Sequence, residues 1–423
     1  NMENWRCIML NIKRWVLLLA ILPVQLYAQE NTVSLDTVLT RIENNNLLLQ
    51  TYALKAESYK HKAKAGTAWM APMVGVGTFM TPYPGQQVMD NGDKGSLMFQ
   101  FEQDIPNPGK LNAQKRYVES KGKLELAGRA IALNELKAQA KSLYYTWIVA
   151  AERIRVLKEN DKIMQMMKKI EQIRYPYNQS QLSGVFRANA KIEENKNMIR
   201  MQEGDISKAK AWLNSLMNVP ANQQLEIDST FKPEFNPQAA LDTSILASQR
   251  KDIVQMEQNI NSMKLGVDAM KAQSKPDFKI RIDHMSPLNK MMPNAYSVMG
   301  MISIPIAPWS SKMYKSEVKA MDYEIRAMEK ERAGMLQESQ GMIYGMQYQI
   351  ETMEKRITAM EDKIIPALKK TLDADFVNYQ ENKLQLPAVI NSWEAFTMMQ
   401  IDVLDEKTKL YQMIVDYEKE LYR

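Results

Sequence analysis

The chain has 423 residues, of which 45% are hydrophobic and 25% charged, and its formal net charge is +6. The first 28 residues contribute +2 of this, so the rest carries only +4, which argues against nucleic-acid binding. One cysteine and two histidines exclude a disulfide framework, cysteine metal clusters and most histidine-based catalysis. The low counts of glycine (16) and proline (17) predict long uninterrupted elements, whereas the 32 methionines require an explanation.

The N-terminal segment has the features of an export signal. Lys13 and Arg14 precede a short apolar run, Val16 to Leu22, and Leu26-Tyr27-Ala28 is a suitable cleavage site. We therefore predict a signal peptide over residues 1–28, with Met2 and Met9 both open as starts. No other stretch approaches 18 apolar residues, so membrane-spanning helices are not expected.

The rest of the chain contains the same pattern twice, at an offset of about 204 residues. Each copy reads as a helix, two short strands, a very long helix, a turn and a second helix. The predicted elements are helices 35–72 and 241–276, strands 73–80, 96–101, 277–283 and 296–305, long helices 110–177 and 312–379, and final helices 183–217 and 385–422. This predicts a mainly α fold with a small β part, divided into a first repeat (29–217), a connector rich in proline and asparagine (218–237) and a second repeat (238–423).

The predicted strands alternate apolar with polar residues, which indicates one apolar and one wet face. In 277–283, for example, Phe278, Ile280 and Ile282 alternate with charged residues. An outer-membrane barrel would turn the apolar face to lipid and the polar face to its lumen, whereas a soluble sheet would cover the apolar face with a helix. The candidate lumen residues are Gln100, Glu102, Lys279, Arg281, Asp283, Met299 and Met301.

Four strands are too few to close a barrel, because small barrels need about eight. Open strand edges are not tolerated in lipid, so the membrane interpretation requires several chains, each contributing four strands. The loops 81–94 and 286–294 would then face the outside of the cell.

The long helical stretches would be about 100 Å long. Methionines recur at intervals of seven residues in the second long stretch and in the helix predicted over 241–276. Such spacing is typical of the seam of a supercoiled helix array. Two interpretations stay open: methionine fills a packing seam, or it forms a thioether path for Cu(I) or Ag(I). The spaced residues are Met256, Met263 and Met270, then Met321, Met328, Met335 and Met342, then Met346, Met353 and Met360.

The sequence resembles the TolC-like outer-membrane efflux proteins over essentially the whole mature chain. Three local patterns carry the resemblance, together with the duplicated plan. They are Arg174-Tyr175 with Asn178 and Val185-Phe186-Arg187-Ala188, the second-copy pattern Tyr379, Asn382, Val389-Ile390 and Ser392, and the segment EQDIPNPGKLNAQKR (102–116), which is similar to heavy-metal efflux members.

The resemblance implies a homotrimer with a twelve-stranded β-barrel in the outer membrane of a Gram-negative bacterium and an α-helical tunnel in the periplasm. It implies contact with outer-membrane lipid, a periplasmic adaptor protein and an inner-membrane pump, with no nucleic acid and no cofactor. The residues that match the tip turns and adaptor contacts of the family are Asn178, Ser180, Leu182, Asn382, Leu384 and Leu386. The alternative role of these leucines is packing between the paired helices.

Two departures from the family pattern concern the tip. The turn glycine is replaced by Asn178 and Asn382, and asparagine is the next-best residue for a left-handed backbone. The acidic ring that closes some members would fall at Ala388 and Asn391, neither of which is charged. The replacement candidates for a constriction are Gln385, Asn391 and Glu394.

The sequence contains no phosphate-binding glycine loop and no nucleophile elbow, and its carboxylates alternate with Lys and Arg, as on solvated helix faces. These absences argue against an enzyme, and the resemblance together with the duplicated plan leads us to expect a passive exit channel of a tripartite efflux system. Its cargo would be small molecules or metal ions, with Cu(I) or Ag(I) favoured by the methionines. The alternatives are a periplasmic coiled-coil adaptor or structural protein, and a type I protein secretion duct.

Overall fold

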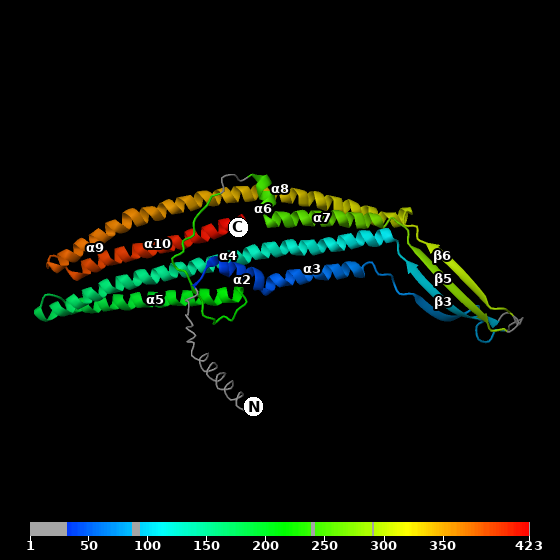
Figure 1. Cartoon of the computed structure of the whole chain (residues 1–423), viewed down its shortest axis with the longest axis horizontal. Coiled ribbons are helices and arrows are strands. Elements are labelled where there is room, and N and C mark those ends of the chain that lie inside the picture. The colour runs from blue at the N-terminus through cyan, green and yellow to red at the C-terminus, as the bar shows by residue number, and fades with distance from the viewer. Residues whose placement is uncertain (1–31, 87–93, 238–241, 290–291, 423) are drawn as a thin grey trace, which may run out of the picture.

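A computed structural model of the chain describes residues 32–86, 94–237, 242–289 and 292–422. The molecule is a long array of helices with a four-stranded sheet at one end and two helical turns at the other (Figure 1). The C-terminus lies near the middle of the array. The predicted signal peptide lies outside the described residues, as do parts of both predicted outer loops.

Both halves follow the predicted element order, and the mainly α fold class is confirmed. The first half contains α2 (Leu35–Asn45), α3 (Leu47–Ala65), β2 (Met73–Phe79), β3 (Ser96–Ile105), α4 (Pro108–Arg174), the 3₁₀ turn η2 (Tyr175–Tyr177) and α5 (Leu182–Leu216). The second half contains α6 (Thr243–Gln249), α7 (Lys251–Ala272), β5 (Phe278–Pro287), β6 (Ala295–Ile302), α8 (Pro308–Ala359), the π-helical turn η3 (Met360–Ile364), α9 (Ile365–Gln380) and α10 (Leu386–Glu420).

The first helix of each repeat is broken, contrary to the prediction of one helix over 35–72 and one over 241–276. The breaks occur at Asn46 and Arg250, which lie 204 residues apart and have extended backbones. The Asn46 side chain accepts a hydrogen bond from the Leu48 N–H and donates one to the Leu216 carbonyl at 2.9 Å. A polar side chain that competes with helix hydrogen bonds therefore stabilises the break.

The two long helices differ in continuity. Helix α4 runs for 67 residues, beginning at Pro108 behind the N-cap Asn107. Its counterpart in the second repeat is interrupted by η3, just before Pro366. Proline lacks the N–H that a continuous helix would need, which explains the interruption on this side only.

The core lies where helices from both halves meet. The largest buried cluster joins α4 with α2, α5, α8 and α10, and includes Tyr144, Trp147 and Tyr417. A separate cluster between α7 and α8 contains Ile260 and Ile325, with Met256, Met263, Met321 and Met328 packed against it. These sevenfold-spaced methionines therefore fill a helix–helix seam, which supports the packing interpretation for them.

The connector 218–237 contains a short strand that the sequence pattern did not predict. Strand β4 (Glu226–Ile227) pairs in parallel with β1 (Thr32–Val33), which precedes α2. Phe231 stacks on Tyr145 at 6.1 Å between ring centroids, and Phe235 contacts Tyr417. The connector is thus held against the middle of the helical array.

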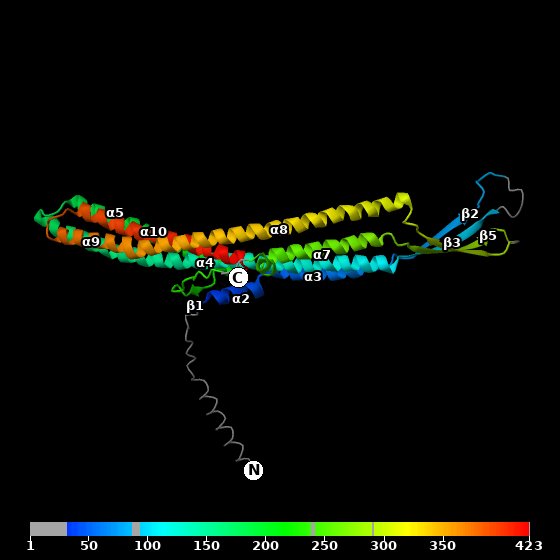
Figure 2. The same ribbon diagram turned by 90° about the horizontal axis from the view of Figure 1, so that it is seen from above.

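The main sheet has the strand order β2-β3-β5-β6, and all its neighbouring strands are antiparallel. Strands β3 and β5 each extend four residues beyond their predicted ends. None of the described helices covers either face of this sheet, which projects beyond the helical array (Figure 2). Within the described part of the chain, every helix is too short or too polar to cross a membrane.

Arg250 offers a test of the second helix break. Its side chain is 8% exposed, pairs with Asp252 at 2.7 Å and Glu420 at 2.6 Å, and so ties the start of α7 to the end of α10. We expect Arg250→Ala to lower the free energy of unfolding by about 2 kcal/mol, because two partly buried carboxylates lose their partner. Denaturant unfolding measures this, with Lys383→Ala as the control. The exposed Lys383–Glu381 pair should contribute less than about 1 kcal/mol.

Candidate functional site

The sheet places the predicted lumen residues on one face. Gln100 lies opposite Asp283, and Glu102 lies opposite Arg281, which in turn lies opposite Met299. Lys279 of the same face lies opposite Met301. The structure therefore brings all seven residues together, and their role in a lumen stays a prediction.

Ion pairs organise this polar face. The Lys279 Nζ lies 2.5 Å from Glu102 Oε1 and 3.2 Å from Asp104 Oδ1. The Arg281 Nε donates to both carboxylate oxygens of Asp283, at 2.9 and 3.0 Å. Each cation is thus matched by carboxylates on the same or the adjacent strand.

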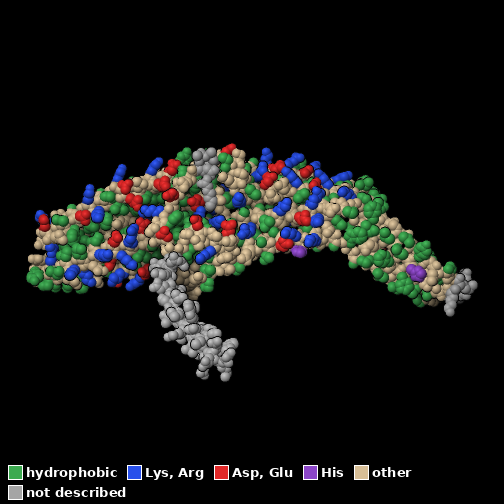
Figure 3. All heavy atoms as spheres, viewed as in Figure 1, with side chains coloured by type: hydrophobic (Ala, Val, Ile, Leu, Met, Phe, Trp, Pro, Cys, Tyr) green, Lys and Arg blue, Asp and Glu red, His purple; other side chains and the backbone are tan. Residues whose placement is uncertain are grey.

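The opposite face of the sheet is apolar and exposed. Val74, Phe101, Ile282 and Val298 form one row across all four strands. Val74 is 75% and Val298 63% exposed, and hydrophobic side chains cover this end of the molecule (Figure 3). A soluble sheet would bury such a face, so this surface requires another apolar partner.

The helical tip at the other end is built from two turns of the same geometry. Asn178 has φ = 59° and Asn382 has φ = 62°, the left-handed conformation expected of residues that replace a turn glycine. The Asn178 N–H donates to the Tyr175 carbonyl, and the Asn382 N–H donates to the Tyr379 carbonyl, both at 3.1 Å. The internal repeat thus extends to individual backbone hydrogen bonds.

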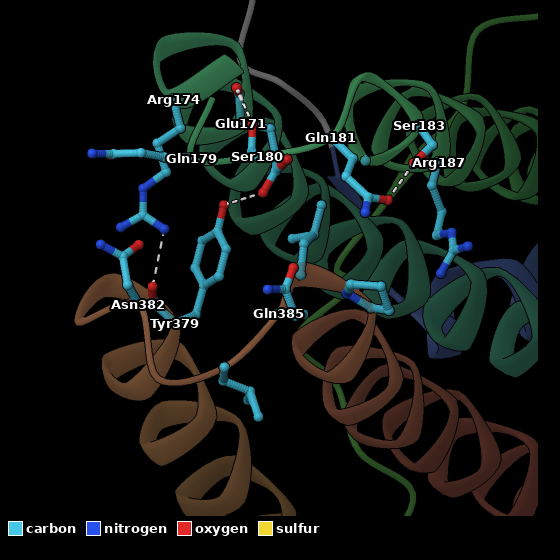
Figure 4. A pocket seen from close by; sticks show the side chains of 14 residues that line it. Glu171, Arg174, Gln179, Ser180, Gln181, Ser183, Arg187, Tyr379, Asn382 and Gln385 are labelled. Atoms are coloured by element: carbon cyan, nitrogen blue, oxygen red, sulfur yellow. Dashed lines mark hydrogen bonds between the residues drawn. The ribbon is translucent and has the colours of Figure 1, made fainter. Parts of the chain in front are cut away.

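A pocket of about 260 Å³ separates the two turns, and a buried network spans it (Figure 4). Glu171 of α4 is 3% exposed and accepts a 2.5 Å hydrogen bond from the hydroxyl of Tyr379, which is the penultimate residue of α9 and is 2% exposed. The Arg174 guanidinium donates to the carbonyls of Tyr379 and Gln380 at 3.0 and 2.8 Å, and lies over the Tyr379 ring. We call Glu171, Arg174 and Tyr379 the tip link, because they join the first repeat to the second.

The hydroxyl of Tyr379 keeps its proton at neutral pH, as its hydrogen bond to Glu171 requires. Burial, reinforced by the hydrogen bond to Glu171, raises the pKa of Tyr379 above its ordinary value of 10.0. A raised tyrosine pKa stabilises the folded state at pH values below 10 and loses this effect as pH rises through the raised value. The tip link is therefore complete at neutral pH.

Gly184 of α5 makes room for the tip link. A Cβ at this position would lie 2.6 Å from Glu171 Oε2 and 3.2 Å from a methyl group of Leu386. The Ser180 hydroxyl donates to the Glu171 carbonyl at 3.1 Å and holds the returning chain beside the same residue. Glycine is thus required here by close approach, not by backbone conformation.

The predicted apolar contacts at the tip divide between two environments. Leu182 is 44% exposed and stays available as a predicted adaptor contact. Leu384 is half-buried, and Leu386 is 3% exposed within the cluster formed by α4, α5, α9 and α10. Leu386 therefore does not fit the predicted adaptor contact, because it packs between helices of its own chain.

The three constriction candidates lie in different environments. Gln385 lines the tip pocket and is exposed, as is Asn391 one and a half turns further along α10. Glu394 is half-buried and pairs with Lys191 of α5 at 2.8 Å, in the groove between α5 and α10. Its carboxylate is thus already neutralised, which weakens the prediction that it lines a constriction.

The tip link has no signature in the amino-acid sequence. Arg174 and Tyr379 belong to the two motifs that carried the family resemblance, but their contact with each other was not foreseen. Glu171 is one of many glutamates on a charged helix, and Gly184 carries no special backbone signal. Only the approach of the end of α4 to the end of α9 at the tip brings Glu171 and Arg174 to Tyr379.

No protein-family model matches the chain, and no curated protein matches it. Solved structures do match over nearly its whole length. CusC, whose structures concern transmembrane channel formation, is 15% identical and matches with a TM-score of 0.71, over 92% of this chain and 91% of its own. The MtrE outer-membrane channel of Neisseria gonorrhoeae, solved in its open state, is 16% identical with a TM-score of 0.70, covering 92% and 88%. The outer-membrane protein VceC of Vibrio cholerae is 13% identical with a TM-score of 0.69, covering 92% and 95%.

The chain has the TolC-like channel fold. The resemblance predicted from the sequence is therefore confirmed at the level of the fold.

Gly184→Ala provides a test of the tip link. The added methyl group must displace the Glu171 carboxylate, and overpacking of this kind costs about 2 kcal/mol. We expect faster hydrogen exchange at residues 171–186 and 376–386, measured by mass spectrometry. The matched control is Gly204→Ala on the same helix, where a Cβ meets nothing within 4 Å. This control should leave exchange at the tip unchanged, and equal exchange in both variants would contradict the assignment.

Proposed function

We propose that this chain is the outer-membrane exit channel of a tripartite efflux system, working as a homotrimer with a periplasmic adaptor and an inner-membrane pump. The observation that carries the proposal is the sheet with one ion-paired face, one exposed apolar face and two free edge strands. This surface suits lipid on one side and a water-filled lumen on the other.

The free edges support assembly with other copies. Strands β2 and β6 are the outer members of the four-stranded sheet. In lipid each unpaired backbone group costs several kcal/mol, so these edges must pair with neighbouring chains. Three copies supply twelve strands, enough for a barrel with a wet interior.

The helical array supports a passive tunnel. Helix α4 alone is about 100 Å long, and the sheet and the tip lie at opposite ends of the molecule. The polar sheet face and the tip would be the two ends of one conduit, with the energy supplied by the pump. Neither end calls for catalysis in this chain. Within the described residues, no feature favours the adaptor or protein-secretion alternatives.

The tip link and η3 support a gate at the periplasmic end. The link attaches α9 to α4, and η3 interrupts the helix that leads to α9. Lys407 of α10 pairs with Glu361 of η3 at 2.9 Å and with Glu152 of α4 at 3.3 Å. Burial disfavours the charge of Lys407, but these carboxylates outweigh it and raise its pKa. Release of the tip link would let α9 and α10 move about η3, which the ion pairs of Lys407 hold in place.

Assembly and conductance test the proposed function. The purified full chain should migrate as a trimer that becomes a monomer on boiling, and should form ion-conducting channels in planar lipid bilayers. A single, stable monomer in detergent-free buffer, with no conductance, would overturn the proposal.

The double variant Arg174→Gln/Tyr379→Phe should open the tip. It removes the Tyr379 hydroxyl, which donates a hydrogen bond to Glu171, and the Arg174 guanidinium, which binds the carbonyls at the end of α9. We expect a several-fold rise in single-channel conductance with the trimer retained. The control is Tyr175→Phe, an exposed tyrosine one residue from Arg174. Unchanged conductance in the double variant would contradict the gating role of the link.

The helix interruption at η3 gives a separate prediction. Pro366→Ala restores the missing N–H and favours a continuous helix, since proline in a helix interior costs about 3 kcal/mol. Introduced into the opened double variant, it should lower the open-channel conductance. Pro308→Ala, at the first turn of α8, is the matched control, because proline is tolerated at that position. An equal effect of both substitutions would exclude η3 as a hinge.

A further inference from the structure

Two methionines face each other on the polar side of the sheet. Met98 of β3 and Met285 of β5 are register partners, and they share a face with Gln100 and Asp283, two residues away on each strand. Directly opposed residues in an antiparallel pair have Cβ atoms about 5 Å apart. Two thioether groups therefore approach one another on the face that we assign to the lumen.

The row that contains this pair ends in a small residue on each side. Its outer members are Gly77 on β2 and Ala295 on β6. A Cβ at Gly77 would meet nothing within 4 Å, and both Met98 and Met285 are partly exposed. The seam methionines, such as Met263 and Met321, pack against a buried cluster between two helices, whereas Met98 and Met285 belong to none of the buried hydrophobic clusters of the described residues.

The carboxylate beside the pair is already engaged. Asp283, two residues from Met285, is 5% exposed and accepts two hydrogen bonds from Arg281 at 2.9 and 3.0 Å. A divalent cation that prefers oxygen would have to displace this partner. The free donors in this row are the two sulfur atoms.

We propose that Met98 and Met285 form a two-thioether binding site for a soft monovalent cation of the Cu(I) or Ag(I) class. The proposal rests on the proposed function, because it makes this cation a cargo that contacts the channel wall. Soft thioethers select Cu(I) and Ag(I) over hard or borderline cations. In a trimer the site occurs three times at one level of the barrel.

Other methionines extend the same face. Met299 and Met301 of β6 and Met73 of β2 lie on the polar side by register, at the two edges of the sheet. They are exposed, and in a closed barrel each would lie beside a neighbouring chain. A cation released from the central pair would therefore meet further single thioethers, which would bind it more weakly than the pair does.

Silver binding to the purified full-length trimer tests the site. Ag(I) is titrated by isothermal calorimetry into the wild-type chain and into Met98→Leu/Met285→Leu, which keeps the apolar volume and removes both sulfur atoms. We expect the double variant to lose one binding event per chain or to bind it at least tenfold more weakly. The control is Met201→Leu/Met398→Leu, which removes two exposed methionines from helices α5 and α10 and should bind like wild type.

Two further measurements separate the possible failures. A tenfold excess of Zn²⁺ should not displace Ag(I) from the site. Equal silver binding in both double variants, or displacement by Zn²⁺, would overturn the site even if the trimer forms and conducts. Absence of the trimer and of conductance in the wild-type chain would instead overturn the proposed function. Trimer migration of the Met98→Leu/Met285→Leu variant checks that it folds.

Discussion

The apolar face and the free edges of the four-stranded sheet are the constraint on which the rest of the molecule depends. A single chain leaves the row of Val74, Phe101, Ile282 and Val298 without cover and two strand edges without partners. No arrangement of the described helices relieves either problem, because they stop short of the sheet. The lipid contact and the pairing with neighbouring copies that we propose would thus both originate in the four strands of this sheet.

At the opposite end of the molecule, the two copies of the duplicated unit form the helical tip. Both turns use an asparagine in the left-handed conformation and equivalent backbone hydrogen bonds. The helices that lead to them differ, since α4 is continuous whereas its counterpart is interrupted by η3 before Pro366. A duplicated unit has in this way acquired one continuous and one interrupted arm, which the buried tip link joins.

Methionine occupies two different environments in this chain. In the seam between α7 and α8 it packs against isoleucine and valine, as an adaptable side chain suited to a curved helix pair. On the sheet, Met98 and Met285 stand among ion-paired residues and small neighbours. The secondary structure that presents a methionine therefore decides its neighbours, and the cation site that we propose depends on the register of β3 and β5.

The amino-acid sequence by itself determined the element order, the duplication, the two faces of the strands and the resemblance to TolC-like channels. These follow from local periodicity and from turn residues such as Asn178 and Asn382, which act within a few residues of the chain. Tertiary structure decided the breaks at Asn46 and Arg250, the burial of Leu386, the tip link and the pairing of Met98 with Met285. Each of these depends on which segment lies beside another, at separations of up to about 200 residues, and local periodicity carries no information about such neighbours.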